Sequence, residues 1–292
     1  MKDFQSKIKP LSTWCALNRL DINWSKTFIM FVTNKRVSLP SSVDLNGVSV
    51  SVISEFKLLG VTLDNKLNFS KQVSIVCRQI NSKLFSIKRL FYLSTAVKLQ
   101  FFKTFILPYF DYCMSLHIYY PKVAIIKLTK CFYLCLYKLF NFNFDSCSPN
   151  STNDALVKYG LYSFEYRFLF RLLTFTNKLV FSLNNNFTAP KALTDLLRPN
   201  IVRQGPTDST LTDHNLRNKG DLDVATSLSR FGDMTFGFIF PKFINLTCLD
   251  FINLKPSDFV NRSRSCLSLI FKNFMNATLK QPDKYAIFKK FF

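Results

Sequence analysis

The chain is poor in glycine and histidine and has no long uncharged apolar run. Seven glycines in 292 residues argue against folds built on glycine-rich phosphate loops or propellers. The two histidines and eight scattered cysteines form no CxxC pair and no zinc-ligand spacing. Charged residues interrupt the apolar stretches 99–120 and 131–144, and the first twelve residues contain no apolar run, so neither a membrane span nor a signal peptide is expected. The sequence predicts an intracellular protein, nuclear or cytoplasmic, with reduced cysteines.

Acidic side chains are also scarce. Lysine and arginine number 39 against 18 acids, a net charge of +21, and Glu55 and Glu165 are the only glutamates. The hydrophobic share of 48% excludes a disordered basic tail, which needs low hydrophobicity. An AT-rich coding sequence would enrich lysine and phenylalanine together, but it does not explain the lack of acids. A polyanion that screens the positive charge, above all nucleic acid, is the expected partner.

The first 64 residues are expected to form a small α+β unit. The chain reads there as one amphipathic helix followed by short apolar strands. The Asn46-Gly47 pair, flanked by alternating valine and leucine, is a strong hairpin signal. The expected elements are a helix at 3–18, a strand at 27–32, a hairpin at 43–52 and a strand at 56–63 that Gly60 breaks.

A helical period begins at residue 66 and predicts one long helix over 66–91. Its apolar residues follow at steps of three or four and form a continuous stripe. At about 100° per residue, Lys71, Arg78 and Arg89 lie within about 20° of one another on the opposite side. A solvated face and a surface for a polyanion both fit this pattern. The near absence of acidic i,i+4 partners leaves the second interpretation open.

The remainder of the chain is expected to be helical, apart from a polar stretch at 199–230. The predicted fold class is therefore α+β, with a small β-containing unit followed by a mostly α-helical body. Phenylalanine and leucine on these helices are interpreted as packing residues. The expected helices span 95–107, 109–119, 122–140, 152–159, 163–182, 190–197 and 263–279, with a further apolar stretch at 231–254.

Four sequence blocks, in order, resemble one family. Residues 14–27 resemble the pattern W-C-x-x-N-x-L-x-[IL]-N-x-x-K-T, and residues 56–64 resemble [YF]-K-[YL]-L-G-V-x-[LI]-D. Residues 104–113 resemble a P-x-[LF]-x-Y-[CG] helix. The segments from His214 and from Arg230 together resemble the family's C-terminal block, although its G-P-x-[LI]-W-N is degraded here. This family is the reverse transcriptases of non-LTR (LINE-type, jockey-like) retrotransposons.

The resemblance implies a division of the chain into four parts. These are a palm remnant at 1–64, a helical thumb at 65–185, a linker or loop-rich insertion at 186–230 and a C-terminal extension at 231–292. The whole is then the C-terminal portion of an RNA-directed DNA polymerase, a nucleotidyltransferase of a mobile element.

The resemblance also implies roles for individual residues. Lys26 matches the motif D lysine, the proposed general acid for pyrophosphate departure, and this match is favoured over the alternative of a solvated lysine in a turn. Asn23 is expected to fix the turn before it. Leu58, Leu59 and Gly60 match the primer grip, where glycine lets the backbone approach phosphates; a strand bulge is the alternative. Lys71, Arg78 and Arg89 would follow the minor groove and phosphates of a template–primer duplex.

The magnesium-binding half of the family's active site has no counterpart in this sequence. Family members hold two Mg²⁺ ions with aspartates, including a Y-x-D-D turn, and this chain has no Asp-Asp or Glu-Asp pair. No metal ligand or cofactor is therefore expected in this chain, which is expected to be inactive alone. The expected partners are the RNA/DNA template–primer duplex and the missing palm and fingers. A membrane is not expected as a partner.

Two other functions remain open from the sequence. One is a non-enzymatic helical nucleic-acid-binding protein, or a relic open reading frame without a selected role. The other is a scaffold that uses a phenylalanine-rich surface, which would show no salt-sensitive binding of RNA or DNA. The chain is therefore part of an enzyme only if a partner supplies the metal-binding carboxylates.

Overall fold

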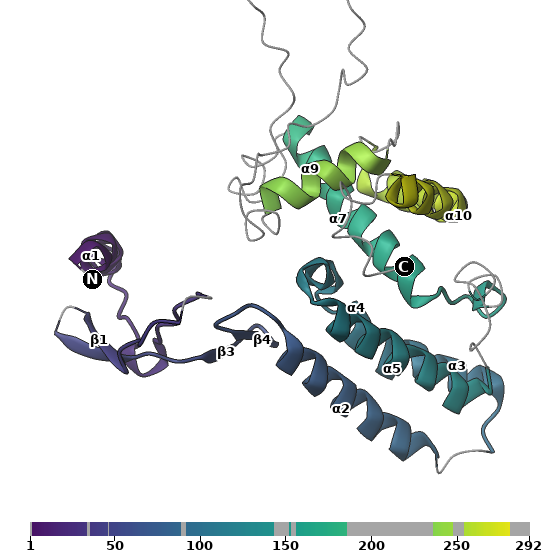
Figure 1. Ribbon diagram of the computed structural model, residues 1–292, viewed down its shortest axis with the longest axis horizontal. Coiled ribbons are helices and arrows are strands. Elements are labelled where there is room, and N and C mark those ends of the chain that lie inside the picture. Colours follow the sequence, from purple (N-terminus) through teal and green to yellow (C-terminus); the bar gives the residue numbers. More distant parts are fainter. Residues whose placement is uncertain are drawn as a thin grey trace, which may run out of the picture. The chain divides into compact units, whose positions relative to one another are not determined.

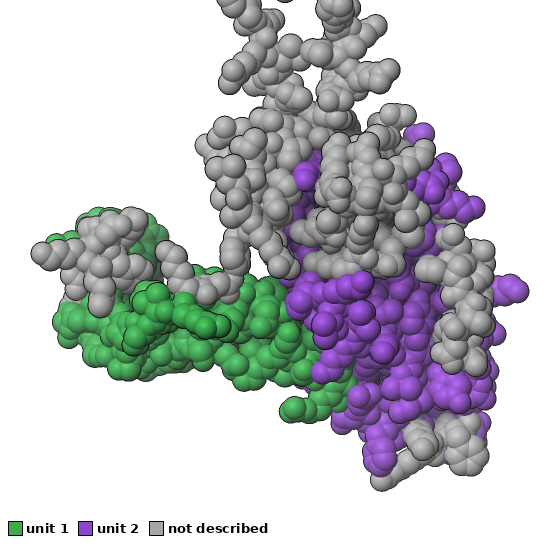
Figure 2. Space-filling view, viewed as in Figure 1, with its two compact units in different colours: residues 1–78 green, residues 79–292 purple. Residues whose placement is uncertain are grey.

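The computed structural model describes residues 2–33, 36–45, 47–88, 92–142, 152, 156–185, 236–247 and 254–280 (Figure 1). The described chain is mostly helical with two small antiparallel hairpins, so an α+β composition is confirmed. It divides into two compact units, residues 1–78 and residues 79–292 (Figure 2). Arg89, the helix expected at 190–197 and the polar stretch 199–230 lie outside the described residues.

Unit 1 begins with the expected amphipathic helix and continues into two β-hairpins. The helix continues through Pro10 without a break. The elements are α1 (Lys2–Leu17), a short 3₁₀ turn η1 (Trp24–Lys26), β1 (Ser42–Leu45), β2 (Val48–Ser51), β3 (Glu55–Leu58) and β4 (Val61–Asp64). Each hairpin is a separate two-stranded sheet.

The β1–β2 hairpin confirms the expectation from the Asn-Gly signal. Val43 faces Val50 and Leu45 faces Val48 in the antiparallel register. The alternation of exposed and buried residues along β1 sends its apolar side chains to one face, as the two-residue side-chain period requires. Gly47 closes the turn with a φ of +80°, which only glycine adopts without steric cost.

One hydrophobic cluster of unit 1 joins the helix to the first hairpin. Four aliphatic side chains are buried in it: Ile29, Val43, Leu45 and Val50. Ile8 of α1, Trp24, Phe31 and Val52 pack against this cluster while staying partly exposed. Segment 27–32 contributes Ile29 to this cluster. A strand was expected there, but the segment makes one isolated parallel bridge, from Ile29 to Val52.

The apolar stretch 56–63 differs from the expectation of one strand broken by Gly60. It forms the two antiparallel strands β3 and β4, with Leu58 paired to Val61 across a two-residue turn. Leu59 and Gly60 both have positive φ, 46° and 88°, as in a type I′ turn, whose twist suits a hairpin. The physical reason for the difference is therefore this turn, which reverses the chain.

Helix α2 (Ser70–Lys88) follows β4 and confirms the predicted apolar stripe. Val73, Ile80, Leu84 and Ile87 are each at most 4% exposed. The helix begins four residues later than predicted, because the segment after β4 is held in non-helical turns by hydrogen bonds to the Asp64 carboxylate.

The described part of unit 2 is helical, and α5 has the bounds predicted for it. The helix expected at 95–107 is instead divided before Pro108, and its last turns are π-helical. Proline lacks an amide hydrogen, so an irregular turn there accommodates the missing bond. The elements are α3 (Thr95–Phe101), a π-helical segment η2 (Phe102–Ile106), α4 (Leu107–Asp111), a 3₁₀ segment η3 (Met114–Tyr119), α5 (Lys122–Phe140), α7 (Phe164–Asn185), α9 (Phe236–Thr247) and α10 (Pro256–Lys280).

The core of unit 2 is aromatic. Phe102, Phe110, Phe132 and Phe164 are at most 1% exposed, and Phe132 contacts the other three rings at centroid distances of 5.3 to 6.0 Å. Edge-to-face contacts of this kind add stabilisation beyond the buried area. The interpretation of these phenylalanines as packing residues is therefore confirmed.

Helix α10 packs on α7, and α9 packs on α10, within unit 2 (Figure 1). Tyr166 stacks on Phe271 of α10 with ring centroids 4.2 Å apart. The side-chain amide of Asn177 donates to the Leu254 carbonyl at 2.9 Å. In the described part of the chain, no helix combines the length and apolar character that crossing a bilayer requires.

Candidate nucleic-acid interface

The turn that carries Lys26 is fixed by Asn23. The Asn23 side-chain oxygen accepts hydrogen bonds from the Lys26 amide at 3.2 Å and from the Ser25 hydroxyl at 2.6 Å. The Asn23 carbonyl accepts one from the Thr27 hydroxyl at 2.8 Å. Asparagine is suited to this work because its side chain satisfies backbone amides at turns and caps. The expected role of Asn23 in fixing the turn is confirmed.

Lys26 itself is exposed at the end of this turn. Within the described residues no carboxylate pairs with it. Its surroundings are therefore those of a solvated cation next to an extended segment. The general-acid role implied by the resemblance stays a prediction.

The segment after Lys26 joins both hairpins within unit 1. The Ile29 amide donates to the Ser51 carbonyl at 3.0 Å, at the end of β2. The Phe28 ring lies 6.0 Å from the Phe56 ring of β3, centroid to centroid, and the Thr33 amide donates to Asn65 at 3.1 Å. The segment after Lys26 thus links the Lys26 turn to the β3–β4 hairpin, although the two are about 30 residues apart in sequence.

The tip of the β3–β4 hairpin is apolar and exposed. Leu58 is 50% exposed and Leu59 is 83% exposed, and every residue of β3 is exposed. The left-handed backbone costs a residue with a Cβ about 1–2 kcal/mol, and Leu59 accepts this cost at a position where asparagine or glycine is usual. Such strain is typical of functional sites, and the hairpin turn replaces the strand bulge as the alternative interpretation.

Asp64 fastens this hairpin to α2. Its carboxylate accepts hydrogen bonds from the backbone amides of Lys66, Asn68 and Phe69 at 2.9 to 3.2 Å. Three amides satisfied by one side chain hold the connection in a defined non-helical turn. The sequence block ending in this aspartate was matched, but the role of Asp64 was missed. A strand-ending Asp before a polar segment and a helix is the signal that indicates it.

A second bond joins the hairpin to the helix. The side-chain oxygen of Gln72 accepts the Thr62 amide at 2.8 Å, and both residues are buried. A buried hydrogen bond to an otherwise unsatisfied strand amide is costly to break. The hairpin and the first turns of α2 therefore form one rigid arm.

The cationic face of α2 is exposed where the structure describes it. Lys71 and Arg78 are both exposed, and Lys71 forms an ion pair with Glu55 of β3. This pairing was not foreseen, because Glu55 lies 16 residues away in sequence. Arg78 has no ion-pair partner among the described residues. The position of Arg89 falls outside them.

Comparison with known proteins identifies no relative. The chain matches no family model, no curated protein and no solved structure. Within the described ranges, no three histidine, cysteine, aspartate or glutamate side chains gather as metal ligands would. The family resemblance therefore depends on the sequence blocks alone.

Proposed function

We propose that this chain is the primer-holding part of a non-LTR retrotransposon reverse transcriptase and binds an RNA/DNA template–primer duplex through unit 1. The observation that carries the proposal is the rigid arm: an exposed apolar hairpin tip, joined through Asp64 to a helix whose exposed side carries Lys71 and Arg78. The order of the four sequence blocks and the net charge of +21 support it.

The arm offers two kinds of contact to a duplex. Exposed lysine and arginine on one helix face bind phosphates and release counterions, which makes affinity depend on salt. Gly60, with no side chain, leaves the backbone of the hairpin tip open to close approach by a phosphate. Contacts of both kinds position nucleic acid without reading its sequence.

The Lys71–Glu55 ion pair tunes the phosphate contact. Both side chains are substantially exposed, 55% and 40%, and exposed pairs contribute only about 0–1 kcal/mol. Lys71 can therefore exchange Glu55 for a phosphate at little cost. Glu55 then acts as a weak competitor that the duplex displaces.

Polymerisation requires carboxylates that this sequence does not contain as an adjacent pair. Lys26 and the arm would then serve a metal site supplied by another polypeptide segment. We expect no dNTP incorporation by this chain alone on a primed RNA template. Metal-dependent incorporation by the purified chain would contradict the proposed division of labour.

Binding is tested by titrating a labelled RNA/DNA duplex at several salt concentrations and following fluorescence anisotropy. The double variant Lys71→Gln/Arg78→Gln is expected to lower the slope of log affinity against log salt by about 1–2, since each lost phosphate contact removes about 0.7–0.9. Lys122→Gln/Lys130→Gln is the matched control, because it removes two exposed charges from helix α5. Equal losses in both variants would sink the assignment of the interface to α2.

Glu55→Gln provides an opposite test. It frees Lys71 from its acidic partner and is expected to raise duplex affinity about two- to fivefold at low salt, in line with the small energy of an exposed ion pair. The gain should disappear when Lys71→Gln is added. An affinity that falls in Glu55→Gln would show that the ion pair organises the site instead of competing with it.

A further inference from the structure

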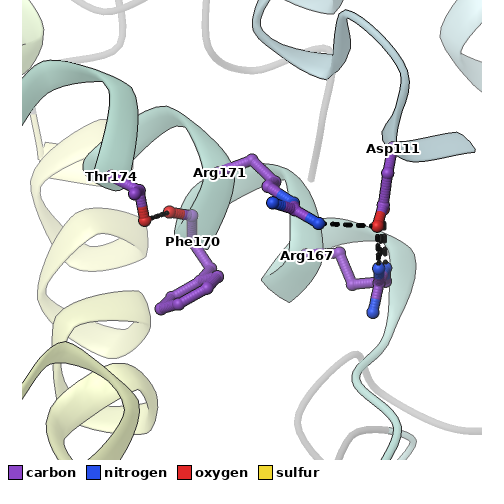
Figure 3. Close-up of polar contacts among 5 residues, drawn as sticks. All are labelled: Asp111, Arg167, Phe170, Arg171 and Thr174. Carbon is purple, nitrogen blue, oxygen red and sulfur yellow. Dashed lines mark hydrogen bonds and ion pairs between the residues drawn. The ribbon is translucent and has the colours of Figure 1, made fainter. Parts of the chain in front are cut away.

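A partly buried ion-pair cluster lies in unit 2, where Asp111 ends α4. The Arg167 guanidinium donates to Asp111 through Nε at 3.2 Å and Nη2 at 2.6 Å, and Arg171 donates through Nη2 at 2.8 Å (Figure 3). The side chains of Arg167 and Asp111 are only 13% and 17% exposed, whereas that of Arg171 is 50% exposed. One carboxylate thus orients two arginines, which stand one turn apart on α7.

A cavity of about 400 Å³ opens beside this cluster. The described residues that line it come from the segment before α7, from α7 itself and from α10. They are Gly160, Tyr162, Arg167, Phe170, Arg171 and Arg264. This volume is within the range of small-molecule sites, about 300–1,000 Å³.

The cavity is strongly cationic and partly aromatic. Among the described residues, the three guanidinium groups of its wall (+3) and the adjacent Asp111 (−1) sum to +2. The Arg264 guanidinium lies 5.7 Å from the centroid of the Phe170 ring, a cation–π contact that holds it in place. The Lys103 ammonium donates to the Tyr159 carbonyl at 3.1 Å, next to Gly160, and adds a further positive charge nearby.

This combination fits a phosphate monoester. Such a group carries about −1.5 to −2 charges at neutral pH, which matches the +2 of the wall, whereas a backbone diester carries one charge per phosphate. Arginine binds phosphate oxygens with two parallel hydrogen bonds. A cavity of this volume accepts one nucleotide but not a duplex. Tyr162 and Phe170 offer aromatic surface to a base.

We propose that this pocket is a binding site for a nucleotide-sized phosphate monoester. Arg171 and Arg264 bind the phosphate, while Asp111 is a positioning residue that holds Arg167 and Arg171. Two sources share this chemistry: a free nucleoside monophosphate and the 5′-phosphate end of a single-stranded nucleic acid. The proposal is independent of the proposed function, because its residues lie in unit 2 and none belongs to the α2 arm.

The test measures binding of four probes to the full chain by calorimetry and anisotropy. The probes are AMP, adenosine, a short single-stranded RNA with a 5′-phosphate, and the same RNA with a 5′-hydroxyl. At least one phosphorylated probe is expected to bind about tenfold or more tightly than its unphosphorylated counterpart, as charge-assisted bonds imply. A preference limited to AMP identifies a free nucleotide, and a preference limited to the RNA identifies a strand end.

Variants locate the preference in the pocket. Arg171→Gln/Arg264→Gln is expected to abolish it, while Lys178→Gln/Lys272→Gln, which removes two exposed charges from the same helices α7 and α10, keeps it. Thermal unfolding checks that both variants are folded. Equal affinity for phosphorylated and unphosphorylated probes, or equal loss in the control variant, would overturn the proposal. Retained preference in Arg171→Gln/Arg264→Gln would overturn it as well.

Discussion

The two units are stabilised in different ways. Unit 1 has one hydrophobic cluster of four buried aliphatic side chains and depends on turns fixed by Asn23 and Asp64. Unit 2 buries a connected group of phenylalanine rings that excludes water by itself. Burial is the dominant stabilising term, so unit 2 has the larger reserve of stability. Both units leave large apolar side chains exposed, among them Leu59 in unit 1 and Phe85 and Val123 in unit 2.

The largest expected effect comes from the aromatic core. Phe132→Ala should destabilise unit 2 by about 3–5 kcal/mol, because it opens a cavity among three rings. Leu45→Ala should destabilise unit 1 by about 2 kcal/mol, the lower end for such changes, since a small two-stranded site can collapse.

The chain offers a separate probe for each unit. Both tryptophans, Trp14 and Trp24, lie in unit 1, so their fluorescence during urea unfolding reports on it, while far-UV circular dichroism reports chiefly on the helices of unit 2. Phe132→Ala should shift the circular dichroism transition, and Leu45→Ala should shift the tryptophan fluorescence transition. Coincident shifts of both probes in either variant would show that the units unfold as one.

An effect close to that of Phe132→Ala is expected from Asp111. Asp111→Asn leaves the mostly buried Arg167 without a counter-charge and should cost about 3 kcal/mol in the circular dichroism transition. Arg171→Gln should cost no more than about 1 kcal/mol, since Arg171 is half exposed. If the two variants were equally stable, the cluster would not act as a buried ion pair.

A smaller effect is expected at the joint between β4 and α2. Asp64→Ala leaves three backbone amides without their acceptor and should cost about 1–2 kcal/mol, as lost caps do. The tryptophan transition measures this loss in unit 1. Asp64→Asn, which keeps a side-chain oxygen, should recover part of the stability. If it recovers none, the negative charge of Asp64 stabilises unit 1, and its hydrogen bonds to the turn amides do not.

The smallest effect has the opposite sign. Leu59→Gly relieves a left-handed residue, worth about 1–2 kcal/mol, and loses about 0.5–1 kcal/mol to backbone entropy. Unit 1 should therefore become about 0.5 kcal/mol more stable, while duplex affinity falls if the tip contacts the primer. Reduced stability in this variant would mean that the Leu59 side chain contributes packing that outweighs the strain.

Local signals in the sequence predicted much of unit 1. The Asn46-Gly47 pair predicted the β1–β2 hairpin, and Asn23 predicted the turn at Lys26, because both effects act within a few residues. The β3–β4 turn was missed because leucine at a positive φ is disfavoured, so no residue preference indicates it. The Lys71–Glu55 pair was missed for a related reason, since strand pairing brings the two residues together.

What the sequence determined by itself is the pattern of short-range periodicity: the α2 stripe, the full length of α5, the helical character of the C-terminal part and the excess of positive charge. Only the tertiary structure decided which distant residues meet. Asp111, Arg167 and Arg264 come from three separate helices, and no local preference links them. Helix packing brings Asp111 against Arg167 and places Arg264 with Arg167 at one cavity, although these residues are more than fifty positions apart in the chain.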